Sequence, residues 1–173
     1  MSKSPAYDPQ RQEVYRMEKK GLFGLNRTRL TRAEHRHLLS LGCAKFGIKP
    51  PRLLYKPGKA WAGLYVSAPV PSITMSTTYV GGLSAMTLLH ELAHHIVYCC
   101  DLTDRLAPHG PEFVGVYGDL MECMGFIPFG SWELLTEQFR IARFDTGLMT
   151  PAQVMDAIKK RAAEAAPKSP PKR

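Results

Sequence analysis

The pattern of apolar and polar positions predicts a chain that begins and ends in helices and has a β-rich middle. Residues 31–47 place apolar side chains at Leu38, Leu41 and Phe46, and we expect this face to meet a core. Thr31 precedes them with Glu34 three residues later, which is the capping-box pattern of a helix start. Three short runs rich in β-branched and aromatic residues follow, separated by Pro and Gly, and predict three antiparallel strands at 52–56, 60–68 and 72–76.

The longest apolar segment, GGLSAMTLLHELAHHIVYCC, predicts a helix that is buried on most sides. Ser84 is its expected N-cap, and the apolar run continues to about Cys100. Four further helices are predicted, beginning near Asp8 and Pro9, at Pro111, after a Ser131 cap and after a Thr150 cap.

These elements predict an α+β fold in which helices pack on a small three-stranded antiparallel sheet. With 173 residues, 45% of them hydrophobic, the chain suffices for one ordinary core. We expect a basic, partly flexible N-terminal segment at 1–20, a single domain at 21–166 and a disordered, basic, proline-rich tail at 167–173. The chain contains no apolar run long enough for a membrane helix, and its first residues lack a signal-peptide core, which predicts a cytoplasmic protein without membrane contact.

Positive charge is concentrated in the N-terminal third. Residues 1–60 contain 14 Lys and Arg against 4 Asp and Glu, whereas the remaining residues carry a small net negative charge. This asymmetry favours a polyanionic partner, for which DNA is the commonest candidate; a solvated basic face that aids solubility is the alternative. The four cysteines form no CxxC pair, so the sequence offers no zinc ribbon, and we interpret them as buried thiols.

The sequence HELAH in the long apolar helix has the HExxH pattern of metalloproteases. Residues four apart share one face of a helix, so His90 and His94 can present two imidazoles to one metal ion, with Glu91 beside the first. Histidines and a glutamate are a poor choice for an inert buried helix, because desolvating them without partners costs several kcal/mol. We expect His95, rotated about 100° from His94, to lie on the outer face of the helix rather than to bind the metal.

A catalytic zinc ion usually has three protein ligands and one open position, so a third ligand is needed downstream. Among the candidates His109 stands out, because it lies in a predicted loop before a helix and precedes Gly110, which permits a close backbone approach. Glu112 can either orient a ligand imidazole or favour its own helix N-terminus. The other candidates are Asp101, Asp104 and Glu122.

The sequence HELAH, followed after fourteen residues by HGPEF, resembles the core of the SprT-like zinc metalloprotease family, to which the DNA-dependent protease Spartan belongs. The small uncharacterised metallohydrolases of bacteria and phages share a similar HELAHH-type core. The resemblance covers mainly residues 84–125. It implies a zincin-like metallopeptidase domain in which His90, His94 and His109 bind Zn²⁺ and Glu91 is the general base.

The sequence thus predicts a zinc metallopeptidase that hydrolyses peptide bonds, with a protein or peptide as substrate and DNA-associated proteins as the first candidates. The predicted strand at 73–76 is a candidate to pair with an extended substrate peptide. Two alternatives stay open. The target can be a specific regulatory or defence protein with no role for DNA, or the chain can be a non-enzymatic DNA-binding or adaptor protein with structural zinc.

Overall fold

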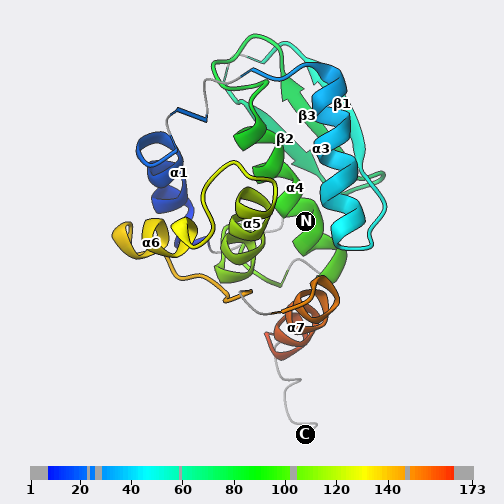
Figure 1. Cartoon of the computed structure of the whole chain (residues 1–173). Helices are drawn as coiled ribbons and strands as arrows, with labels where there is room; N and C mark the ends of the chain where they lie inside the picture. Colours follow the sequence, from blue (N-terminus) through cyan, green and yellow to red (C-terminus); the bar gives the residue numbers. More distant parts are fainter. Residues whose placement is uncertain are drawn as a thin grey trace, which may run out of the picture.

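The computed structural model describes residues 8–22, 24–25, 29–58, 60–101, 105–146 and 149–165. The expectations for the terminal tail at 167–173 and for Asp104 therefore lie outside the described residues, as does the start of the basic segment. In the described part the protein is α+β, with six helices and a small three-stranded sheet (Figure 1). These elements are α1 (Arg11–Lys20), α3 (Arg32–Lys45), β1 (Arg52–Lys56), β2 (Gly63–Val66), β3 (Ser72–Ser76), α4 (Ala85–Cys100), α5 (Pro111–Cys123), α6 (Ser131–Gln138) and α7 (Pro151–Glu164).

The sheet is mixed, so the prediction of three antiparallel strands is wrong. The strand order is β1-β3-β2; β3 pairs with β2 antiparallel and with β1 parallel. The chain does reverse after β1 and again after β2, as the Pro and Gly positions indicate, but β3 then lies between the two earlier strands. The local sequence indicates where the chain turns, but it does not indicate which strand lies beside which. The six residues that connect β1 to β2 are enough to cross the roughly 10 Å that one intervening strand occupies.

This strand order also removes the proposed role of residues 73–76 in binding a peptide by edge pairing. Both edges of β3 are occupied, by Leu53 opposite Ile73 on one side and by Tyr65 opposite Ile73 on the other. Within the described residues, the strand edges left unpaired belong to β1 and β2.

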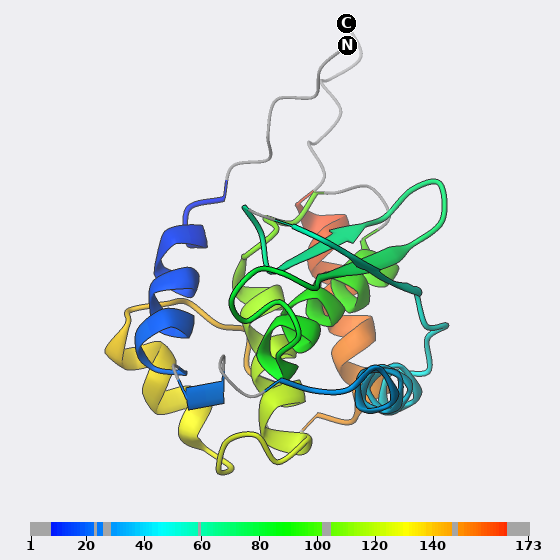
Figure 2. The same ribbon diagram turned by 90° about the horizontal axis from the view of Figure 1, so that it is seen from above.

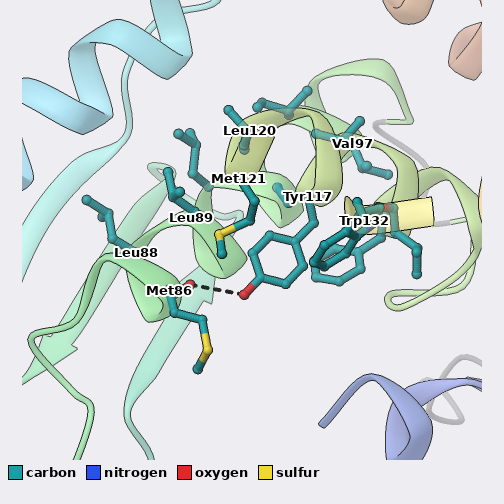
Figure 3. Packing of buried hydrophobic residues seen from close by; sticks show 14 of the residues in the cluster. Met86, Leu88, Leu89, Val97, Tyr117, Leu120, Met121 and Trp132 are labelled. Carbon is teal, nitrogen blue, oxygen red and sulfur yellow. Dashed lines mark hydrogen bonds between the residues drawn. The ribbon is translucent and has the colours of Figure 1, made fainter. Parts of the chain in front are cut away.

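Helix α4 lies at the centre of the molecule and contacts most other elements. It packs on β2 and β3, lies beside α5 over much of its length, and also contacts α3 and α7 (Figures 1 and 2). Figure 3 shows the core between α4 and α5, where the Tyr117 hydroxyl donates to the Met86 carbonyl oxygen and Trp132 of α6 closes one end. Gly118 of α5 permits this closure, because a Cβ there would lie 2.0 Å from the Trp132 ring. Burial on most sides thus explains why α4 has apolar residues on most of its faces.

The helix starts follow the capping residues at three of the predicted positions. Thr31 and Thr150 form complete capping boxes with Glu34 and Gln153, and the Ser84 side chain accepts a hydrogen bond from the Thr87 N–H. The prediction for α6 is wrong by one residue, because its N-cap is Gly130, with φ of 82°. Only a residue that tolerates positive φ fits this turn easily, so glycine takes the cap position in place of serine.

The face of α3 that is buried differs from the predicted face, and it includes His35. The helix buries His35, Leu39, Gly42 and Cys43, whereas Leu41, expected in the core, is 45% exposed. These buried positions have the spacing of one helix face, and the polar residue at its start obscured that face in the sequence.

His35 and His95 are both structural residues inside the fold. Their exposed fractions are 0% and 2%, so the prediction that His95 lies on the outer face of its helix is wrong. Each ring is held at both nitrogens by protein groups, so neither contributes a ligand to a metal.

Helix α1 has one buried and one exposed face. It buries Val14, Met17 and Glu18 and lies beside α6, on the side of the molecule opposite α3 (Figures 1 and 2). No helix in the described part of the chain combines the length and the apolar character that crossing a bilayer requires. The exposed side chains of α1 are largely basic: Arg11, Arg16, Lys19 and Lys20.

Candidate metal centre

Two of the three predicted ligands lie one turn apart on α4. The Nε2 atoms of His90 and His94 are 3.2 Å apart, and the ring centroids are separated by 4.9 Å. His90 is buried and His94 half-buried, so the pair opens toward solvent on the His94 side. The HExxH spacing therefore places both imidazoles on one helix face, as predicted.

The third histidine comes from the loop between α4 and α5. Asp101 ends α4, and its carboxylate accepts hydrogen bonds from the backbone N–H groups of Arg105 and Leu106, which holds the returning chain near the helix end. This places His109 Nε2 at 3.2 Å from His90 Nε2. The candidate ligand atoms of the three histidines all lie within 4.8 Å of one another, close enough to bind a metal ion.

Aromatic side chains support the cluster from two sides. Phe113, which is fully buried at the start of α5, lies 4.9, 4.4 and 4.9 Å from the ring centroids of His90, His94 and His109. Tyr15 of α1 stacks on His90 with a centroid distance of 5.7 Å and meets His109 edge-on at 5.1 Å. Because Tyr15 is 41% exposed, it lies at the rim of the cluster.

The outer ring nitrogens of two histidines bind carboxylates from the N-terminal segment. Glu18 Oε1 lies 2.6 Å from His90 Nδ1, and Asp8 Oδ2 lies 2.6 Å from His109 Nδ1. A carboxylate accepts the Nδ1 proton, so the Nε2 atom of each neutral ring keeps its lone pair toward the cluster. Both carboxylates thus favour the tautomer that a metal ligand needs.

Burial and charge act differently on the three imidazoles. Burial lowers the pKa of His94 well below its ordinary value, and neighbouring positive charge lowers it further. Burial also lowers the pKa of His109, against the opposing effect of Asp8. For His90 burial acts in the same direction, but the Glu18 carboxylate outweighs it and the pKa of His90 is raised.

Glu91 lies against the edge strand β2 next to His90. It is 8% exposed, and its carboxylate accepts a hydrogen bond from the Tyr65 backbone N–H. Burial raises the pKa of Glu91, which the His90 charge and the Tyr65 N–H partly oppose. Gly63 leaves room for this side chain, because a Cβ at Gly63 would lie 2.7 Å from Glu91 Cγ and Oε1.

The remaining candidate ligands have other roles. Glu112 is buried and pairs with Arg161 of α7, so it ties α7 to the start of α5 and does not orient an imidazole. Asp101 organises the loop described above, and Glu122 accepts the Trp132 backbone N–H at 2.9 Å. Neither cysteine at the end of α4 joins the cluster, since the Cys100 thiol contacts Met155.

Sequence reasoning missed Asp8 and Glu18. We interpreted Asp8 as a helix-start residue, yet the N-cap of α1 is Gln10 and the Asp8 carboxylate binds His109 instead. One signal was available for Glu18, because helical spacing places it with Val14 and Met17 on the apolar face of α1. A carboxylate on such a face needs a buried partner.

The donor set of the cluster fits zinc. Ligand nitrogens at about 2.0–2.1 Å from a tetrahedral zinc ion lie roughly 3.3 Å apart, close to the 3.2 Å separations of the Nε2 atoms. Three neutral imidazoles also accept other divalent ions, so this geometry alone does not identify the metal. In comparisons with known proteins, no family model matched the chain, and no curated protein or solved structure showed significant similarity to it.

Proposed function

We propose that the protein is a zinc-dependent metallopeptidase of zincin-like type, with His90, His94 and His109 as metal ligands and Glu91 as the general base. The observation that carries the proposal is the convergence of three Nε2 atoms while the Nδ1 atoms of His90 and His109 donate to carboxylates. Lone pairs that converge in this way repel one another unless a proton or a metal cation lies between them. A bound metal ion removes this repulsion.

A purely structural metal site explains the arrangement less well. Structural zinc sites in proteins are closed by four protein ligands, whereas this cluster has three histidines and a solvent-facing side at the half-buried His94. Glu91 is buried beside His90 without being one of the converging ligands, which is the position of a base in a hydrolytic site.

Glu91 performs the proton transfers in the proposed reaction. Zinc, when bound, supplies Lewis acidity toward water and toward the scissile carbonyl. The Glu91 carboxylate accepts a proton from the attacking water as the oxygen bonds to the carbonyl carbon, and it delivers that proton to the nitrogen when the C–N bond breaks. Burial raises the pKa of Glu91, which makes its carboxylate a stronger base than a solvent-exposed one.

Strand β2 is the part of the sheet that borders this site. Its Tyr65 N–H meets the Glu91 carboxylate, and Gly63 lies so close to Glu91 that a side chain there would clash with it. An extended peptide chain is the substrate shape that suits a strand edge. We therefore propose a protein or peptide substrate that lies along β2.

DNA-associated proteins are the first substrate candidates because of the basic surface near the site. The exposed basic side chains of α1 include Arg11, which lies over the Tyr15 ring at the rim of the histidine cluster. A polyanion bound to α1 would lie next to the proposed site, and its affinity would fall with rising salt concentration. The proposal of a regulatory or defence-protein target differs from this one in requiring no DNA.

The test is cleavage of a DNA-binding protein by zinc-loaded enzyme, with and without single-stranded DNA. Glu91→Gln is the matched inactive control, because the amide oxygen can still accept the Tyr65 N–H while the base is lost. We expect cleavage by the wild-type protein and a loss of at least about a hundredfold in Glu91→Gln, the usual contribution of a general base. Cleavage that is independent of DNA would support the regulatory-target alternative. Zinc binding without cleavage of any of several unfolded protein substrates would contradict the peptidase proposal.

A further inference from the structure

We infer that the N-terminal segment at 8–20 is the outer half of the metal centre, with Asp8 and Glu18 as positioning residues for His109 and His90. The inference rests on the proposed metal site and goes beyond it, because it assigns a role to a segment outside the HExxH and HGPEF sequences. The two faces of α1 have different roles in this inference, since α1 directs the Glu18 carboxylate inward and basic side chains outward.

Glu18 is built into the core and is not a surface charge that happens to meet a histidine. Its side chain is 10% exposed and lies 2.6 Å from His90 Nδ1, and its negative charge adds to burial in raising the pKa of Tyr117. Tyr117 is itself fully buried between α4 and α5 (Figure 3). The Glu18 carboxylate is therefore held inside the core against His90, and it fixes the rotation of the His90 ring in turn.

Asp8 is held on His109 by a second set of contacts. Its two carboxylate oxygens meet the backbone N–H and the Nδ1 atom of His109 at 3.3 and 2.6 Å. Gln10 fastens the adjacent backbone, because its Nε2 donates to the carbonyl oxygens of His109 and Ala142 and its Oε1 accepts the Ala142 N–H. The segment before α1 is thus attached to the loop that delivers the third ligand.

These contacts predict that the N-terminal segment sets metal affinity although it supplies no ligand. An imidazole that can rotate or change tautomer must lose that freedom when it binds a metal, and an outer carboxylate removes the freedom beforehand. Outer partners of this kind typically change metal affinity by about 10- to 100-fold. The loss should be larger when the hydrogen-bond acceptor is removed than when only its charge is removed.

The experiment measures zinc affinity by competition with a chromophoric chelator and the absorption spectrum of the Co²⁺-substituted protein. Glu18→Gln retains an acceptor oxygen, Glu18→Leu removes it, and Asp8→Asn tests the second contact nearer the surface. Glu13→Gln is the matched control, since it makes the same chemical change on α1 at a position away from the histidines. Unfolding of each metal-free variant in urea shows whether the fold is retained.

We expect zinc affinity to fall about tenfold in Glu18→Gln and Asp8→Asn, more in Glu18→Leu, and less than about twofold in Glu13→Gln. The Co²⁺ spectrum should change in the Glu18 and Asp8 variants alone. Unchanged affinity and spectra in folded variants would overturn the inference and leave the proposed function intact, whereas a wild-type protein that binds neither Zn²⁺ nor Co²⁺ would overturn the proposed function itself. If Glu18→Leu does not fold, Glu18→Gln and Asp8→Asn still decide the question.

Discussion

The protein uses histidine in two opposite ways within a short distance of one another on α4. In the metal centre, His90 and His109 bind carboxylates through Nδ1 and turn their Nε2 atoms toward each other and toward His94. In the fold, His95 binds the Lys49 carbonyl oxygen through Nε2 and the Tyr65 hydroxyl through Nδ1. His35 repeats that second arrangement on α3 with the Leu83 carbonyl oxygen and the Tyr55 hydroxyl, each at 3.1 Å.

The neighbours of each ring therefore determine its tautomer and its use. A carbonyl oxygen accepts a hydrogen bond from the Nε2–H group, and the tyrosine hydroxyl then donates a hydrogen bond to Nδ1. Both nitrogens of His35 and of His95 are therefore satisfied by the protein. A carboxylate at Nδ1 does the reverse and turns the Nε2 atom of His90 toward the Nε2 atoms of His94 and His109, each at 3.2 Å. A buried imidazole nitrogen that faces other imidazole nitrogens is the feature that distinguishes these candidate ligands from the structural histidines, whose nitrogens face a carbonyl oxygen and a hydroxyl.

The largest effect that tests this comparison is expected in His94→Ala. Removing one of three imidazoles should weaken zinc binding by about a thousandfold, or roughly 4 kcal/mol. Because His94 is half-buried and faces the open side of the cluster, the metal-free protein should lose less than about 1 kcal/mol of stability. Chelator competition measures the first quantity and urea unfolding with EDTA the second.

The control for this variant is His37→Ala. His37 lies exposed on α3, so its removal should change neither zinc affinity nor stability. A His94→Ala protein that binds zinc as tightly as the wild type would refute the three-histidine site.

The opposite result is expected for His35→Ala. The Tyr55 hydroxyl would lose its histidine partner, the Leu83 carbonyl oxygen would keep the Leu30 N–H, and a cavity would form at the fully buried ring, which should lower the free energy of unfolding by about 2–4 kcal/mol. Zinc affinity of the folded protein should stay within about twofold of the wild type, because His35 does not touch the cluster. A change in affinity comparable to that in His94→Ala would contradict the division into two classes of histidine.

The loss of stability that His35→Ala causes should depend on pH. Burial lowers the pKa of His35, which the Leu83 carbonyl and the Glu34 charge partly oppose. Below the unfolded-state pKa of about 6.5, the unfolded chain therefore binds a proton that the folded state resists, and stability falls as pH falls. The destabilisation by His35→Ala should be constant above pH 7 and shrink toward pH 5, by up to about 1.4 kcal/mol per pH unit. Urea titrations of both metal-free proteins across this range measure it, and a cost that grows on acidification would show the sign to be wrong.

Much of the histidine cluster and most of the helices could be predicted from the sequence, because both depend on residues that are a few positions apart. Thr31 with Glu34, and Thr150 with Gln153, act within one turn of helix, and the HExxH spacing places two imidazoles on one face of any helix. These features need no knowledge of the remaining chain. The bounds of the predicted helices and strands consequently agree with the structure to within a few residues for most elements.

The carboxylate partners of the histidines and the order of the strands could not be predicted from the sequence, because both depend on contacts between distant segments. Glu18 binds a histidine 72 positions later, and Asp8 one that is 101 positions later, distances at which no spacing rule applies. The parallel pairing of β1 with β3 likewise follows from which strand lies between the other two. The burial of His35 likewise depends on distant residues, because its partners Tyr55 and Leu83 belong to other parts of the chain.

The smallest effect that sharpens the comparison is expected in Tyr55→Phe. The variant removes only the hydroxyl that donates to His35 Nδ1, while the ring contacts with His35 and with the Arg32 guanidinium can remain. One buried hydrogen bond contributes about 1 kcal/mol, so the free energy of unfolding should fall by about that amount. Tyr79→Phe, at an exposed position, is the control, and neither variant should alter zinc affinity. A loss as large as that in His35→Ala would mean that the Tyr55 hydroxyl alone holds the ring, whereas no loss would mean that the Nε2 contact to Leu83 suffices to keep His35 structural.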